Sequence, residues 1–315
     1  MFTGVEIENF RGFGKLELTC LGRVNLIVGK NNTGKTSLLE AITLLADPAT
    51  IRPLPGLFRA NAGSVGEQFY RWLLKDGAGT SGTLLSAHSG GEETSRIVLT
   101  AAFGDDDEDF TVRWASEALR LLQSKSHKSV LRVHAVSVQH NKPDSMIDAF
   151  AEAVRAPVDE RQMESLLASV DPRIKSVRLD AMQSKPFIVV DVGLTNRVPL
   201  SQAGQGLYRL VAIFSELLGN KPDLCFIDEI ENGIHYTALP AVWKGIGEVA
   251  ARLGVQVFAT THSRECLVAA HEAFAARDAY DLRVVQLYRL GDASSGRVLD
   301  RAHIEAAIAG DIEVR

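Results

Sequence analysis

The strongest constraint on this chain is a glycine-rich segment that lies between an apolar strand and a helix. Gly29–Thr36 reads G-x-x-x-x-G-K-T, it follows the apolar run Val24–Val28, and a helical pattern begins at Ser37. Glycines let the backbone wrap tightly, so several amide groups can point at one phosphate, and the helix N-terminus adds partial positive charge. A strand before this pattern and a helix after it are the context of a phosphate-binding loop. The segment therefore predicts a nucleoside triphosphate site.

The residues of this loop have separate tasks in such a site. Lys35 can reach the β- and γ-phosphates, and the Thr36 hydroxyl can bind Mg²⁺. We expect the other nucleotide contacts to come from the rest of the loop and the residue after it, which are Gly29, Lys30, Asn31, Asn32, Thr33, Gly34 and Ser37.

A second signal is an apolar strand that ends in two acids. Leu224–Ile227 is continuously apolar, as a central parallel strand requires, and Asp228 and Glu229 follow it. Ligands of parallel sheets bind at the carboxyl ends of the strands. Asp228 is therefore predicted to face the Mg²⁺, directly or through water, and Glu229 to polarise the water that attacks the γ-phosphate.

A third signal is Val257–Ser263, another buried strand that ends in polar residues. His262 at its tip is placed to hydrogen-bond the γ-phosphate or to hold the attacking water. A histidine with a purely structural task is the alternative.

A fourth segment, Ser201–Gly206, opens a helix pattern that extends to Leu218. Glycines and small polar groups at a helix start form a second anion-binding surface. Because one chain does not need two γ-phosphate sites, the simplest use of this surface is to cover the nucleotide bound by another copy. The alternative is a capped helix start without a ligand. The residues expected to reach the second nucleotide are Ser201, Gly204, Gln205 and Gly206.

The periodicity along the chain predicts an α/β fold. The phosphate loop and the last third read as two halves of one mostly parallel core sheet. Between them, β-type alternation dominates residues 83–138, and helical periodicity covers 144–170 with a break at Pro157. We therefore expect one composite P-loop domain in three parts: an N-terminal lobe at 1–50, an inserted antiparallel β and helical subdomain at 51–195, and a C-terminal lobe at 196–315.

Composition narrows the function classes. The chain has 315 residues and a net charge of −5, which argues against a broad basic surface and makes any DNA contact local. It contains no apolar run long enough to span a membrane and no charged-then-apolar leader. Three cysteines without metal-ligand spacing are typical of a reducing cytoplasm. The acidic run Asp105–Asp109 is predicted to be a solvated hairpin tip rather than a cation site.

The order of these motifs resembles the ATP-binding-cassette (ABC)-type ATPases, and within them the branch with OLD-family nucleases, recombination-mediator and SMC-like ATPases and stand-alone anti-phage ATPases. Gln139 is placed like the Q-loop glutamine of this family, which implies contact with the nucleotide and the Mg²⁺. The other matches are Asn9–Phe13 to the opening strand and loop, Gly29–Thr36 to Walker A, Phe226–Glu229 to Walker B, Asp228–His235 to the Walker B and D-loop run, Ser201–Gly206 to the signature motif, and Thr260–Ser263 to the switch-histidine segment.

The resemblance implies Mg²⁺-dependent ATP hydrolysis at two composite sites in a cytoplasmic homodimer, coupled to an effector protein or to DNA. By family analogy the process is phage defence or DNA repair. Two departures stand out. Leu200–Gln205 reads L-S-Q-A-G-Q where transporters have L-S-G-G-Q, and nothing offers the acidic metal site of the Toprim domain that OLD nucleases carry. Coiled-coil heptads of a true SMC arm are also absent from the sequence.

The residues alone also allow other functions. One is a nucleotide-gated module that binds DNA or an effector and whose negligible turnover only resets it. Another is a P-loop GTPase, which the lack of an N-K-x-D base-reading segment disfavours. A nuclease has less support still, because the sequence shows no second cluster of metal ligands.

Overall fold

The computed structural model describes residues 1–47, 50, 58, 83–102, 111–115, 131–136, 143–182 and 185–310. Two sequence predictions lie outside the described residues, namely the acidic run Asp105–Asp109 and the contact expected from Gln139.

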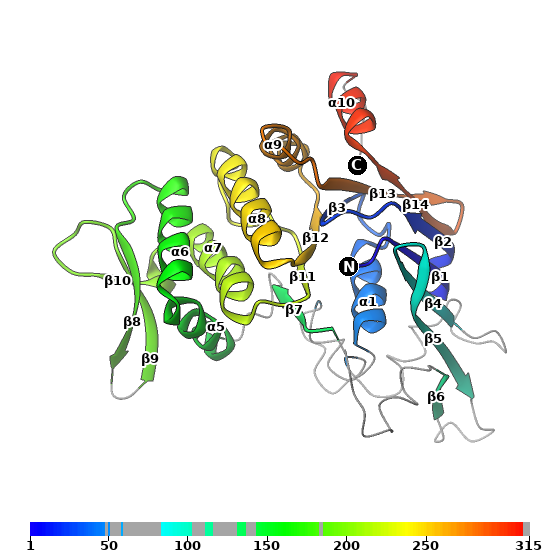
Figure 1. Ribbon diagram of the computed structural model, residues 1–315, viewed down its shortest axis with the longest axis horizontal. Coiled ribbons are helices and arrows are strands. Elements are labelled where there is room, and N and C mark those ends of the chain that lie inside the picture. Colours follow the sequence, from blue (N-terminus) through cyan, green and yellow to red (C-terminus); the bar gives the residue numbers. More distant parts are fainter. Residues whose placement is uncertain are drawn as a thin grey trace.

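One large sheet organises the described part of the chain (Figure 1). Its eleven strands run in the order β6-β5-β4-β1-β2-β14-β13-β3-β12-β11-β7. Five neighbouring strands are parallel: β13 (Leu282–Leu290), β3 (Val24–Val28), β12 (Gln256–Thr261), β11 (Leu224–Ile227) and β7 (Val133–Val136). The rest pair antiparallel, apart from one parallel bridge between β14 and β2, and comprise β14 (Ala293–Leu299), β2 (Phe13–Thr19), β1 (Gly4–Phe10), β4 (Thr83–Ser89), β5 (Glu92–Ala102) and β6 (Thr111–Ala115).

The parallel half brings the phosphate loop next to the last third of the chain. β3 pairs with β12, where Ile27 lies opposite Thr260, and β12 pairs with β11, where Phe258 lies opposite Phe226. The prediction of one mostly parallel core sheet built from both halves is confirmed. The antiparallel strands β4 and β5 extend this same sheet through β1.

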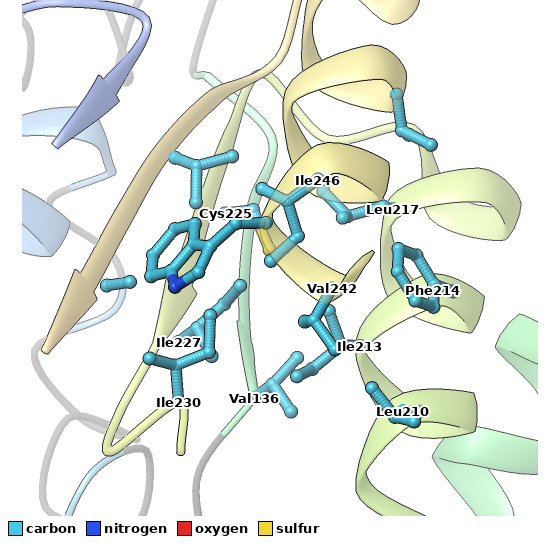
Figure 2. Packing of buried hydrophobic residues seen from close by; sticks show 14 of the residues in the cluster. Val136, Leu210, Ile213, Phe214, Leu217, Cys225, Ile227, Ile230, Val242 and Ile246 are labelled. Atoms are coloured by element: carbon cyan, nitrogen blue, oxygen red, sulfur yellow. The ribbon is translucent and has the colours of Figure 1, made fainter. Parts of the chain in front are cut away.

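Both faces of the three central strands β3, β12 and β11 are buried, which explains why apolar residues dominate them. Along β11, Cys225 and Ile227 belong to one core and Phe226 to the other. The first core contains α7 (Gln205–Ser215) and α8 (Leu239–Leu253), and Figure 2 shows their side chains packed against the β11 residues. The second core contains α1 (Lys35–Ala46), which is buried along almost its whole length. β3, the strand that precedes the phosphate loop, thus lies between two packed layers.

Two helices and a small sheet occupy the sequence before α7. α5 (Pro143–Arg155) and α6 (Pro157–Val170) form where helical periodicity predicts them, and Pro157 is the first residue of α6. The three strands β8 (Ser176–Met182), β9 (Lys185–Asp191) and β10 (Val198–Pro199) form an antiparallel sheet. Figure 1 shows this sheet at the opposite end of the molecule from β1 and β2.

The helix expected from Ser201 begins later than its pattern predicts. Leu200–Gln202 form a separate 3₁₀ turn, and α7 starts at Gln205. Gly204 lies between them with φ +100° and ψ +150°, a conformation that no helix contains. The break places the small residues of this segment in a loop ahead of the helix. At its other end α7 continues into a π-helical turn at Glu216–Asn220.

The remaining described elements are helices α9 (Arg264–Ala275) and α10 (Arg301–Ala309) and a 3₁₀ turn at Tyr236–Ala238 that precedes α8. None of the described helices is both long and apolar enough to cross a membrane.

Candidate nucleotide-binding site

The phosphate loop needs glycine at both of its ends. Gly29 has φ +154° and Gly34 has φ +97°. A Cβ on Gly34 would lie 2.8 Å from the Phe13 ring, and one on Gly29 would lie 2.6 Å from Thr33 Oγ1. Thr33 Oγ1 in turn donates to the carbonyl oxygen of Lys30 at 2.8 Å and closes the turn. The loop therefore has its tight shape because backbone and neighbours meet where a side chain would stand.

Lys35 is buried at the start of α1 and folds back over the loop. Its Nζ donates to the carbonyl oxygens of Gly29 at 2.7 Å and Lys30 at 2.9 Å. Burial lowers the pKa of Lys35 to about 8, although the charges of Asp228 and Glu229 act in the opposite direction. Most of these ammonium groups remain protonated at pH 7, so a positive charge stands above the loop where a phosphate is expected.

Asp228 and Glu229 follow β11 and share one hydroxyl from the neighbouring strand. Thr260 Oγ1 donates to Asp228 Oδ1 at 2.6 Å and accepts from the Glu229 amide at 2.8 Å. Burial raises the pKa of Asp228, and the hydrogen bond from Thr260 opposes this shift. Glu229 has a left-handed backbone with φ +47°, which is costly for a residue with a side chain and concentrates at functional sites.

His262 follows β12 and contacts Glu229 and the nearby Glu231. Its Nε2 lies 3.9 Å from Glu229 Oε1, and its backbone amide donates to Glu231 Oε1 at 2.8 Å. The next residue, Ser263, caps α9 by accepting a hydrogen bond from the Cys266 amide. The end of β12 is thereby fixed on both sides of the histidine.

An open cleft of about 640 Å³ lies over the phosphate loop, a volume that suits a small-molecule ligand. Three residues that the sequence predicts for the nucleotide site line this cleft, namely Lys35, Thr36 and His262. Asp228 and Glu229 do not line the cleft. Their charges raise the pKa of Lys35, and Glu229 also contacts His262, so they influence two residues that do line it. The other wall residues are Asn31, Asn32, Gly34 and Ser37 from the loop and α1, and Arg11, Gly12, Arg289 and Ser294 from elsewhere. The structure thus brings together the loop, the two acids and the histidine.

The signature residues lie on a different surface. Gly204 and Gly206 line a second cleft of about 610 Å³, which shares no described wall residue with the cleft over the phosphate loop. Ser201 and Gln205 are exposed. Gly206 packs directly against the carbonyl group of Gly233, where a Cβ would not fit. The signature loop and the segment after the acids therefore form one exposed surface of the same chain.

Arg209 is a site residue that sequence reasoning missed. It lies in α7, is 5% exposed, and donates through Nη2 to the carbonyl oxygens of Asp228 and, at 3.4 Å, Val136. Its Nε and Nη1 have no hydrogen-bond partner among the described residues. Burial lowers the pKa of Arg209 to about 10, while the neighbouring carboxylates act against this shift. The only signal in the sequence was an arginine at a buried position of an apolar helix pattern.

Oxygen donors near the loop fit a magnesium ion. Thr36 offers a hydroxyl, and Asp228 offers a buried carboxylate whose charge a divalent cation would compensate. Among the described residues, no group of three or more histidine, cysteine, aspartate or glutamate side chains could hold a metal. Mg²⁺ does not need such a group, because phosphates and water usually fill most of its coordination sphere.

Together, the glycine loop after the central parallel strand β3, the histidine after β12 and the acids after β11 define a P-loop ATPase domain. A family model described as "AAA domain, putative AbiEii toxin, Type IV TA system" matches residues 24–267. The chain belongs to this family.

Two curated proteins are similar to this chain over different shares of its length. An "ATP/GTP phosphatase" of Helicobacter pylori is 21% identical over 330 residues, which cover 84% of this chain and 86% of the relative. The "DNA replication and repair protein RecF" of Bacillus thuringiensis is 48% identical over 42 residues, but these are only 13% of this chain and 11% of RecF.

Solved structures show the fold independently of sequence. An SMC head bound to the C-winged helix domain of ScpA has a TM-score of 0.62 at 14% identity and covers 98% of this chain and 99% of its own. The Pyrococcus furiosus SMC head with an extended coiled coil has a TM-score of 0.60 at 11% identity, with 100% and 99% covered. The resemblance to ABC-type, SMC-like ATPases is confirmed at the level of the fold.

Proposed function

We propose that this chain binds ATP with Mg²⁺ and hydrolyses it at two composite sites, which form when two copies face each other head to tail. The observation that carries the proposal is the convergence of Lys35, Asp228, Glu229 and His262 at the carboxyl edge of three neighbouring strands. These are the groups that phosphoryl transfer needs: a cation for the phosphates, a carboxylate for the metal, and a base beside the attacking water.

Each residue of the proposed site has one task. Lys35 and the loop amides bind the phosphates, and Thr36 and Asp228 hold the Mg²⁺, which supplies charge stabilisation when bound. Glu229 accepts a proton from the attacking water, and its left-handed backbone turns the side chain out of the strand. His262 contacts the γ-phosphate, and its contact with Glu229 links the presence of that phosphate to the position of the base.

The second half of each site is assigned to the partner copy. Ser201 and Gln205 are exposed, and the signature cleft lies apart from the phosphate loop of its own chain. Because this segment reads L-S-Q-A-G-Q, we assign the contact to the partner's γ-phosphate to the Ser201 hydroxyl, the Gln205 side chain and the loop amides around Gly204. Closure of the dimer would exclude water and complete the site.

The output of the cycle is proposed to be a partner protein or DNA. The SMC head similar in fold is bound to a domain of ScpA, and the locally similar RecF is named for DNA replication and repair. We propose a cytoplasmic protein whose ATP state controls such a partner, in phage defence or DNA repair.

The variant Glu229→Gln separates binding from hydrolysis. Its amide keeps the shape of the carboxylate but cannot accept a proton, so hydrolysis should fall about 10²–10⁴-fold while ATP binding persists. With saturating ATP and Mg²⁺ this variant should accumulate as a dimer in light scattering, and Lys35→Ala should stay monomeric. A near-normal rate would remove Glu229 as the base, and a Glu229→Gln monomer at saturating ATP contradicts the composite site.

Hydrolysis measured with and without duplex DNA then separates a free-standing ATPase from a DNA-stimulated switch.

A further inference from the structure

The order of the strands gives a direction to a triphosphate bound at the loop. The loop follows β3, and β12 and β11 lie on one side of it with His262, Asp228 and Glu229 at their ends. Strands β13, β14 and β2 lie on the other side (Figure 1). If the γ-phosphate faces the acids, the nucleoside extends across β3 toward β13 and β14.

Among the described residues, four form the wall of the cleft on that second side: Arg11, Gly12, Arg289 and Ser294. Ser294 is buried, its amide donates to the carbonyl oxygen of Gly12 at 2.9 Å, and it pairs with Arg289 across the β13–β14 hairpin. Glu40 is buried and Arg11 is partly buried, with Nε and Oε2 3.1 Å apart, so the charge of Arg11 is compensated. This side of the cleft is therefore built on two strands and one internal ion pair.

Arg289 differs from Arg11 in its surroundings. Its guanidinium makes one hydrogen bond, from Nη2 to the carbonyl oxygen of Asp292 at 3.0 Å, and no described carboxylate forms an ion pair with it. The residue is exposed at the rim of the cleft. A planar cation in this state can lie against an aromatic ring at little cost, because a guanidinium is weakly hydrated.

We propose that Arg289 holds the nucleoside end of the bound triphosphate by packing its guanidinium plane against the purine face, and that ATP and GTP consequently bind with equal affinity. This inference rests on the function proposed above. Stacking uses the π face that both purines share. Selection of one purine needs donors and acceptors aimed at its edge, and none of the four wall residues on this side carries a carboxylate or amide side chain.

The test compares ATP, GTP and inorganic tripolyphosphate by calorimetry, with Mg²⁺ present. Arg289→Ala should weaken ATP and GTP alike by about 5- to 30-fold, which is the size of a lost cation–π contact, and should leave tripolyphosphate unchanged. Arg297→Ala is the matched control, because Arg297 lies on β14 of the same hairpin, hydrogen-bonds Gln286, and is outside the cleft. Arg289→Lys keeps the charge without the plane and should recover little of the lost affinity.

Several results would overturn the inference. They are an unchanged ATP affinity in Arg289→Ala, an equal loss of tripolyphosphate binding, a loss for one purine only, or full recovery in Arg289→Lys, which would show an ionic contact to a phosphate. The proposed function fails in a different way: the wild-type chain would bind neither ATP nor tripolyphosphate, and Lys35→Ala would change nothing. The two failures are therefore distinguishable in one set of titrations.

Discussion

The cleft over the phosphate loop and the cleft at the signature residues differ in how they hold their polar groups. Over the phosphate loop, Lys35 is 7% exposed, and its ammonium is held by two carbonyl groups and by the charges of nearby acids. On the signature surface, Ser201 and Gln205 are exposed, and Gly204 has open space where a side chain would stand. The first cleft is assembled within one chain, while the second presents its groups outward.

This difference indicates which groups of the proposed composite site each chain would supply. A buried, partly desolvated lysine is costly unless an anion arrives, so the loop is preorganised for phosphate before any partner binds. Exposed hydroxyl and amide groups are hydrated and have no such cost, so they remain available for contact with a second chain. Binding of the triphosphate should therefore depend on the first cleft alone, and hydrolysis on both.

Mixing two inactive variants is the most direct test of whether the two clefts act together across two chains. Ser201→Ala with Gln205→Ala should lower hydrolysis about 10²–10³-fold, the cost of removing donors from a transition-state oxygen, and should leave ATP affinity unchanged. An equimolar mixture of this double variant with Lys35→Ala should hydrolyse ATP faster than either variant alone, because a mixed dimer pairs the intact loop of one chain with the intact signature segment of the other and so contains one intact composite site. If the mixture stays as inactive as its parts, the signature surface does not act across an interface.

Lys35→Ala sharpens the comparison from the other side. Loss of one charge-assisted contact to phosphate should weaken ATP binding about 10- to 150-fold. Lys15→Ala, which removes a surface lysine paired with Glu8 on the antiparallel strands, is the control and should bind ATP normally. Calorimetric titration of both variants decides the matter, and equal affinities would refute the phosphate-loop assignment.

Thr260→Val tests how the first cleft is held together. Valine keeps the shape of threonine but leaves Asp228 and the Glu229 amide without their shared hydroxyl, so the free energy of unfolding should fall by about 1–3 kcal/mol. Thr43→Val is the matched control, because the Thr43 hydroxyl bonds only to the Leu39 carbonyl inside α1. Urea unfolding of both variants measures the difference. A loss in Thr260→Val no larger than in the control would mean that the bridge does not stabilise the site.

Much of the site followed from sequence patterns because each pattern obeys a local rule. Gly29 and Gly34 have the positive φ angles that a phosphate loop predicts. Asp228 and His262 come at the ends of parallel strands, and such ends meet at one edge of a sheet. Residues far apart in the chain could therefore be placed together without knowing any contact between them.

Other parts of the site could not be predicted in this way. Thr260 bridges the two acids because β11 and β12 align in one particular register. Arg209 reaches the Asp228 carbonyl because α7 packs on the sheet at one particular rotation. The helix predicted from Ser201 also starts later than its pattern indicates, because Gly204 has φ +100° and ψ +150° and periodicity does not reveal such a break.

The amino-acid order alone predicted which groups gather at the phosphate loop, since glycine freedom, helix starts and strand ends are properties of short segments. Only the tertiary structure decided how those groups are held, that Glu40 pairs with Arg11 while no described carboxylate pairs with Arg289, and that the signature loop lines a different cleft from its own phosphate loop. The reason is physical: burial and pairing of charges depend on distances between distant segments, and these distances exist only after the two cores have packed.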